Sequence, residues 1–132
     1  NFVLLYFIAG ITGNVVSYAA DLMFGTGMTV SAGASTSVFG LFVAVALLGV
    51  LCRGDRRFIR EYSRGMIAVI LVNIAYTLLV PGISVSGHLG GAVGGAVAML
   101  MVPAYALRTP VALRVVVALA WVAAVAFVLF GM

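Results

Sequence analysis

Four long stretches without a charged side chain constrain the fold of this chain more than any other feature. They cover residues 1–20, 22–52, 65–107 and 115–132. A helix that crosses a bilayer needs about 20 predominantly apolar residues, so each stretch can supply at least one span. The third stretch, with 43 residues, can supply two spans and the turn between them. The sequence therefore predicts about five transmembrane helices.

The composition excludes a soluble domain. Of the 132 residues, 65% are hydrophobic and 8% are charged, whereas soluble domains carry about 25% charged residues. Because lipid offers no hydrogen bonds to the backbone, an apolar chain of this kind is expected to be helical. We predict an all-α, polytopic transmembrane helix bundle that forms one domain over residues 1–132, with helices at 2–22, 35–52, 65–80, 87–105 and 111–131.

The beginning of the chain does not resemble a signal peptide. It is apolar from Phe2 onward and has neither a basic region nor a small-residue cleavage site. We therefore expect the domain to be truncated here, with one or more helices upstream of Asn1 in a longer protein.

The arginines predict the orientation in the membrane. The segment 53–64 holds five arginines and two acidic residues, so the positive-inside rule places it in the cytoplasm as a loop. Alternation of the helices then places Arg108 and Arg114 on the same side. The same alternation brings Ser35 and His88, which begin two inward-running helices, to one depth near the outer face.

Ser35 and His88 are the candidate catalytic residues. Gly33 and Ala34 allow close approach of the backbone before a helix whose first N–H groups could bind an oxyanion. A neutral His88 could take the serine proton as general base. The alternative is that Ser35 only caps its helix and that His88 only forms a hydrogen bond at the membrane interface.

Glycines indicate that the helices of Ser35 and His88 pack closely. Two GxxxG pairs follow His88, and small residues on the other helix offer a matching face; the set is Gly33, Gly40, Gly90, Gly91, Gly94 and Gly95. This packing is expected whether or not the chain is an enzyme.

The segment Gly33-Ala-Ser-Thr-Ser-Val-Phe-Gly40 resembles the GxSx motif of rhomboid intramembrane proteases, and Gly87-His-Leu-Gly-Gly91 resembles their catalytic-histidine helix. The motifs stand in the family's order with one span between them. The first four predicted helices are similar to core helices three to six of the family, and the fifth to the extra C-terminal helix of some members.

The resemblance implies a Ser35–His88 dyad without an acidic member. It also implies that the Ser35 N–H contributes to the oxyanion hole, that Phe39 packs against the histidine ring, and that Thr36 reshapes the oxyanion pocket where many members have glycine. Phe39 could alternatively be an ordinary core or lipid-facing aromatic. Asn14 matches a Gly-Asn pattern of the family, and we expect it to form a hydrogen bond between helices.

One part of the family's site has no counterpart in this sequence. In rhomboids, His and Asn side chains of the oxyanion hole come from the second core helix, and a Trp-Arg pair comes from a preceding loop. Both would lie upstream of Asn1.

The predicted function is an intramembrane serine endopeptidase that cleaves transmembrane segments of other proteins. The alternatives are a catalytically inactive rhomboid-like binding or quality-control protein, and a small transporter subunit. We expect no cofactor and no metal, because one His and one Cys cannot build a zinc site. Nor do we expect a nucleic-acid partner, because no basic face is present. Arginine without lysine suggests a bacterial plasma-membrane protein, with its active site toward the extracytoplasmic face.

Overall fold

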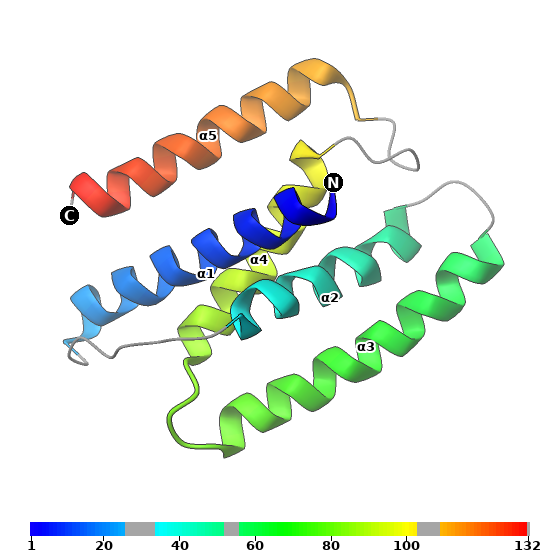
Figure 1. The fold of residues 1–132 in the computed structure, drawn as a ribbon, viewed down its shortest axis with the longest axis horizontal. Coiled ribbons are helices and arrows are strands. Elements are labelled where there is room, and N and C mark those ends of the chain that lie inside the picture. Colours follow the sequence, from blue (N-terminus) through cyan, green and yellow to red (C-terminus); the bar gives the residue numbers. More distant parts are fainter. Residues whose placement is uncertain (26–33, 52–55, 103–108, 132) are drawn as a thin grey trace.

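The computed structural model describes residues 1–25, 34–51, 56–102 and 109–131, and for 49–51, 56 and 58–60 only the backbone. These ranges hold five helices and no strand, as Figure 1 shows: α1 (Phe2–Phe24), α2 (Ser35–Leu51), α3 (Arg56–Leu79), α4 (Val85–Met101) and α5 (Val111–Phe130). The predicted all-α class and the number of helices are confirmed.

Three helical segments within the described ranges are long and apolar enough to cross a membrane, namely Phe2–Phe24, Glu61–Leu79 and Val111–Phe130. α2 and α4 are apolar but shorter, and 17 helical residues rise about 25 Å. Figure 1 shows these two shorter helices on the inner side of the bundle, next to α1. At about 25 Å, α2 and α4 are slightly shorter than the hydrocarbon thickness of about 30 Å.

Two predicted boundaries were wrong, and both errors have a local cause. The segment 56–64 is not a loop but the first turns of α3, because Arg and Glu are good helix formers and this part of the helix needs no apolar face. The helix predicted to reach residue 105 ends at Met101, since Val102 is extended (φ −84°, ψ 133°) as required before Pro103.

α4 is the central helix. Glycines on one of its faces pack against α1, and glycines on another face pack against α2. A Cβ on Gly90 would lie 2.6 Å from the Val16 Cβ on α1, and one on Gly94 would lie 2.7 Å from the Thr12 Cβ. The four glycines of the two GxxxG pairs are therefore divided between two interfaces, because Gly91 and Gly95 face the α2 backbone at Thr36 and Gly40. Helices that pack without large side chains approach each other most closely, which is the usual way to bury surface in lipid.

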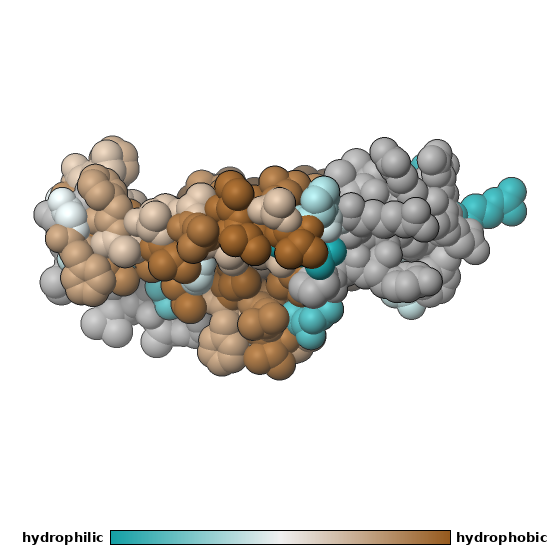
Figure 2. All heavy atoms as spheres, turned by 90° about the horizontal axis from the view of Figure 1, so that it is seen from above, coloured by the Kyte–Doolittle hydropathy of each residue, from teal (hydrophilic) through white to brown (hydrophobic). Residues whose placement is uncertain are grey.

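α3 and α5 lie at the periphery. Among the described residues α5 has no buried side chain, and Ser63 and Thr77 are the buried ones of α3. Among the described residues, large apolar side chains are exposed along α1, α3, α4 and α5, and the coloured atoms on the α5 side of the molecule in Figure 2 are mostly hydrophobic. Such a surface suits a lipid solvent and would not suit water.

Candidate active site

Ser35 lies in the first turn of α2 and is exposed. The Val38 N–H donates to the Ala34 carbonyl at 3.0 Å, so Ala34 occupies the cap position and Ser35 is the first helical residue. The Ser35 hydroxyl is therefore not at the cap position, where the alternative interpretation of this residue placed it. Helix geometry leaves the first N–H groups of α2 without acceptors inside the helix, next to this hydroxyl.

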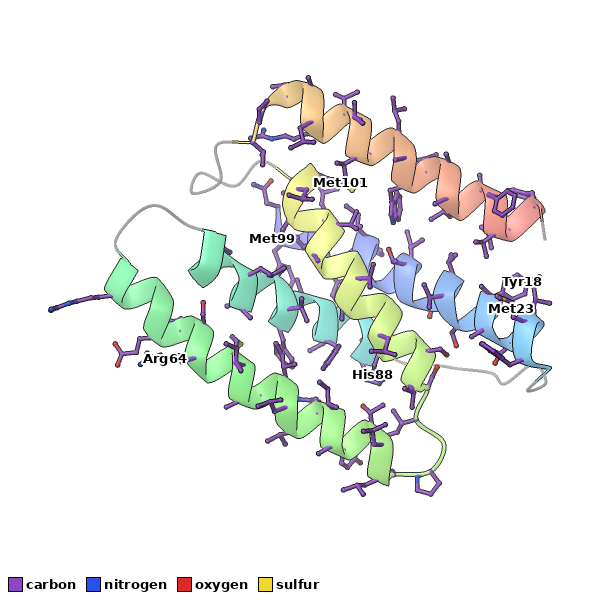
Figure 3. All side chains as sticks on the ribbon, turned by 180° about the vertical axis from the view of Figure 1, so that it is seen from behind. Tyr18, Met23, Arg64, His88, Met99 and Met101 are labelled. Atoms are coloured by element: carbon purple, nitrogen blue, oxygen red, sulfur yellow. The ribbon has the colours of Figure 1, made fainter. Side chains whose placement is uncertain are left out.

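His88 lies in the first turn of α4 and is buried, with 9% of its surface exposed. The turn is fixed by Ser84, the N-cap residue, whose hydroxyl accepts a hydrogen bond from the Gly87 N–H at 3.0 Å. Figure 3 shows His88 near the start of α4, on the side where α2 begins. A capping serine thus determines where the helix of the histidine starts.

The Ser84 carbonyl determines which ring nitrogen of His88 carries the proton. It lies 2.9 Å from the His88 Nδ1 and also accepts from the His88 backbone N–H at 3.2 Å. A carbonyl oxygen can only accept, so the neutral ring must be protonated on Nδ1. This leaves the lone pair on Nε2, and the imidazole is prepared to take a proton at that atom.

Phe39 holds the imidazole from the α2 side. The rings of Phe39 and His88 pack edge to face, with centroids 5.5 Å apart and an interplanar angle of 80°. Phe39 is one turn after Ser35 on α2 and is 4% exposed. The His88 ring is therefore fixed by one hydrogen bond from its own helix and one aromatic contact from the helix of Ser35.

Thr36 joins the starts of α2 and α4. A Cβ on Gly87 would lie 3.2 Å from the Thr36 Cγ2, and a Cβ on Gly91 would collide with the Thr36 carbonyl oxygen. The residue after Ser35 is therefore packed against the residue before His88. The Thr36 side chain is buried, and it also lies against Gly13 of α1.

The expected hydrogen bond between Ser35 and His88 is not formed in the described part of the chain. The two residues lie at the same end of the bundle, joined through Thr36 and Phe39, but no hydrogen bond connects their side chains. Catalytic hydrogen bonds are often long before substrate binds and shorten in the reacting complex.

The expected interhelical hydrogen bond of Asn14 is also not seen within the described ranges. The buried face of α1 includes Gly10, Gly13 and Ser17, and Asn14 is rotated about 100° from Gly13, onto an exposed side. Gly33 lies outside the described residues, so its position next to Ser35 stays a prediction.

Sequence reasoning missed Ser84 and Ser17. The Ser17 and Ser84 hydroxyls, from α1 and the start of α4, lie 3.0 Å apart. A capping signal was present at Ser84, which comes directly before an apolar helix. Nothing in the sequence pairs it with a residue 67 positions earlier.

Comparison with known proteins identifies the family of this chain. Residues 1–105 match the family model of the Rhomboid domain, and α5 lies beyond the matched residues. Over 95 residues the chain is 36% identical to the Rhomboid protease GluP of Bacillus subtilis (strain 168). That match covers 72% of this chain and 17% of the relative, so the chain spans about a sixth of the length of that protein. No solved structure matches the chain significantly.

The family match covers the helices that carry Ser35 and His88, and the exposed surface of the bundle is apolar. The chain is therefore an integral membrane protein that belongs to the rhomboid family of intramembrane proteases.

Proposed function

We propose that this protein is a serine endopeptidase that cleaves transmembrane segments of other membrane proteins, with Ser35 as nucleophile and His88 as general base. The observation that carries the proposal is the orientation of His88. Its Nδ1–H donates to the Ser84 carbonyl and its ring packs on Phe39, at the end of the bundle where Ser35 begins α2. This arrangement leaves Nε2 free to accept the serine proton.

In the acylation step, the Ser35 Oγ attacks the carbonyl carbon of the scissile peptide bond while its proton passes to the His88 Nε2. The negative charge that forms on the carbonyl oxygen is stabilised by N–H groups of the first turn of α2, which also carry the positive end of the helix dipole. His88 then gives the proton to the leaving amine, and the peptide bond breaks to leave an ester on Ser35.

Deacylation reverses the proton transfers. A water molecule loses its proton to the His88 Nε2 and attacks the ester carbonyl, and the Ser35 oxygen takes the proton back as it leaves. The imidazolium formed in each half of the reaction keeps its Nδ1–H on the Ser84 carbonyl, so a neutral oxygen takes the place that an acidic residue holds in a triad.

The substrate class follows from the secondary structure of the target. A peptide bond within a helix is hidden from a nucleophile, so a transmembrane substrate must unwind locally. We propose that substrates carry small or helix-breaking residues near the cleaved bond. The site is proposed to open to the extracytoplasmic face of a bacterial plasma membrane, because the arginine-rich start of α3 marks the opposite side.

Labelling of the full-length protein in detergent micelles by a fluorophosphonate probe tests this proposal. We expect labelling of the wild type and loss of labelling in both Ser35→Ala and His88→Ala, because the probe reacts only with an activated serine. A folded wild type that does not react would contradict the protease and would favour an inactive rhomboid-like binding protein. The substrate class is tested in liposomes with reporter helices that differ only by a Gly-Gly pair in place of Leu-Leu, of which the Gly-Gly reporter should be cut faster.

A further inference from the structure

Three serine hydroxyls near His88 form a closed ring that the dyad does not include. The Ser17 and Ser84 hydroxyls lie 3.0 Å apart, those of Ser84 and Ser86 lie 3.2 Å apart, and the Ser86 hydroxyl donates to Ser17 at 3.4 Å. Ser17 comes from α1 and is 8% exposed, whereas the other two stand at the start of α4. This hydroxyl ring links two helices at the turn that carries the histidine.

Counting protons shows that every hydroxyl of the ring can donate one hydrogen bond within it. Each hydroxyl has one proton and can accept two hydrogen bonds. Because Ser86 donates to Ser17, each hydroxyl donates once when Ser17 donates to Ser84 and Ser84 donates to Ser86. The Ser84 oxygen then accepts from Ser17 and from the Gly87 N–H, which uses both of its lone pairs. A ring in which every hydroxyl donates, and in which the Ser84 oxygen accepts twice, holds the Ser84 side chain in one rotamer.

The same Ser84 holds the histidine through its backbone. Its carbonyl accepts from the His88 Nδ1, and its dihedral angles (φ −71°, ψ 107°) direct that carbonyl into the first turn of α4. Ser84 is also the last residue of the connection from α3, the helix that packs least on α4. An anchor on α1 would keep this carbonyl in place when α3 or the connection shifts.

We propose that Ser17, acting through the hydroxyl ring, is a positioning residue for the general base: it fixes the Ser84 carbonyl and thereby the Nδ1–H tautomer and orientation of His88. The proposal rests on the proposed protease function for its kinetic consequence, but its structural consequence can be measured in an inactive protein. It also explains why a dyad without an acidic member can keep its lone pair on Nε2.

The test compares Ser17→Ala with Ser63→Ala. Ser63 is a matched control, because it is a buried serine (5% exposed) whose hydroxyl donates across helices, from α3 to the Val45 carbonyl of α2. Ser17→Ala loses the hydrogen bonds to Ser84 and Ser86, and Ser63→Ala loses the one to Val45, so we expect a small decrease of the melting temperature in both variants. Only Ser17→Ala removes a member of the hydroxyl ring.

The kinetic measurement is the rate of fluorophosphonate labelling of the full-length protein as a function of probe concentration. A general base contributes about 10²–10⁴-fold to such a reaction, so partial misorientation should lower the limiting rate on the order of tenfold in Ser17→Ala. The probe concentration that gives half the limiting rate should not change. Ser63→Ala should label at the wild-type rate.

The spectroscopic measurement is ¹⁵N NMR of the histidine ring, with the His88 signals assigned by their loss in His88→Gln. The wild type should show a protonated Nδ1 and an unprotonated Nε2 in the neutral ring, and Ser17→Ala should add a population protonated on Nε2. A Ser17→Ala variant with the wild-type tautomer and rate, or a Ser63→Ala variant as slow as Ser17→Ala, would overturn the positioning role. A tautomer that depends on Ser17 in a wild type that does not label would support the positioning role and contradict the protease.

Discussion

At the residue scale, the chemistry of the candidate site depends on how one imidazole is held. The Ser84 carbonyl chooses the tautomer of His88, and the Phe39 ring restrains the plane of the imidazole from the opposite helix. Neither contact supplies charge. Both reduce the number of orientations that a side chain with two free torsions could take, which is how a positioned base gains its rate advantage.

Replacing Phe39 by Leu should slow the labelling reaction without unfolding the protein. An edge-to-face aromatic pair is worth about 0.5–1.5 kcal/mol, and if the contact orients the base, its loss corresponds to a decrease of about twofold to tenfold in rate. Fluorophosphonate labelling measures the change. Phe127→Leu is the control, because Phe127 is 65% exposed on α5. Equal rates for Phe39→Leu and the wild type would remove the proposed role of Phe39.

The sequence could predict some of these residues and not others. Ser35 and His88 stand out because they begin two apolar helices that run the same way. The contacts of His88 with Ser84 and of Ser84 with Ser17 could not be predicted, since they depend on a capping geometry and on the distance between helices. Asn14 shows the opposite failure: its polar side chain in an apolar helix suggested a partner, but one residue of rotation places it outside the interface.

At the element scale, the glycines of α4 decide how closely α1 and α2 can approach. Gly90 and Gly94 face α1, whereas Gly91 and Gly95 face α2, where a Cβ would collide with backbone atoms that cannot rotate away. The same closeness brings Thr36 against Gly87 and so brings the start of α2 to the start of α4. The α4 glycines that allow close packing therefore also determine the geometry of the candidate site.

Gly91→Ala should be strongly destabilising, whereas Gly65→Ala should not be. Overpacking of this kind costs about 1–3 kcal/mol, and here the contact atom is the Thr36 carbonyl oxygen. Gly65, within α3, has nothing within 4 Å of its Cβ position, so Ala should be neutral or stabilise the helix by up to about 1 kcal/mol. Unfolding midpoints in micelles measure both. A midpoint for Gly91→Ala at or above that of Gly65→Ala would show that α2 and α4 are not in close contact.

α5 is joined to the bundle by a specific polar contact. The Trp121 Nε1–H donates to the Thr12 hydroxyl at 2.9 Å, and Thr12 in turn donates to the Ile8 carbonyl. Trp121→Phe should therefore lower the unfolding free energy by about 0.6 kcal/mol, a typical value for a hydrogen bond between membrane helices. Fluorophosphonate labelling should not change, because α5 does not contribute to the site. A large loss of labelling would show that α5 supports the dyad.

At the scale of the whole molecule, the number of helices could be predicted because each span needs a charge-free stretch of fixed length. The start of α3 could not, because arginine and glutamate are compatible with both a loop and a helix that extends beyond the lipid. The end of α4 was predictable in principle from Pro103, but the charge-free stretch continued past it. A stretch without charged residues thus identifies a spanning helix, whereas helix propensity and proline determine the residues at which the helix begins and ends.

The proposed orientation predicts which ends of the bundle a membrane-impermeant maleimide can reach in intact cells. In a Cys52→Ser background, Pro81→Cys should be labelled without permeabilisation. Residue 81 lies in the connection from α3 to α4, at the same end of the bundle as His88. Arg57→Cys, near the start of α3, should be labelled only after permeabilisation. The reverse pattern would place the candidate site on the cytoplasmic face.

The most direct test of the central claim is to identify the residue that carries the adduct after fluorophosphonate treatment, by mass spectrometry of the digested protein. The account predicts that the phosphonate is bound to Ser35, that no adduct forms at the ring serines Ser17, Ser84 and Ser86, and that the Ser35 adduct is lost in His88→Ala. An adduct on another serine, or a Ser35 adduct that forms equally well without His88, would contradict the assignment of these two residues as a catalytic dyad.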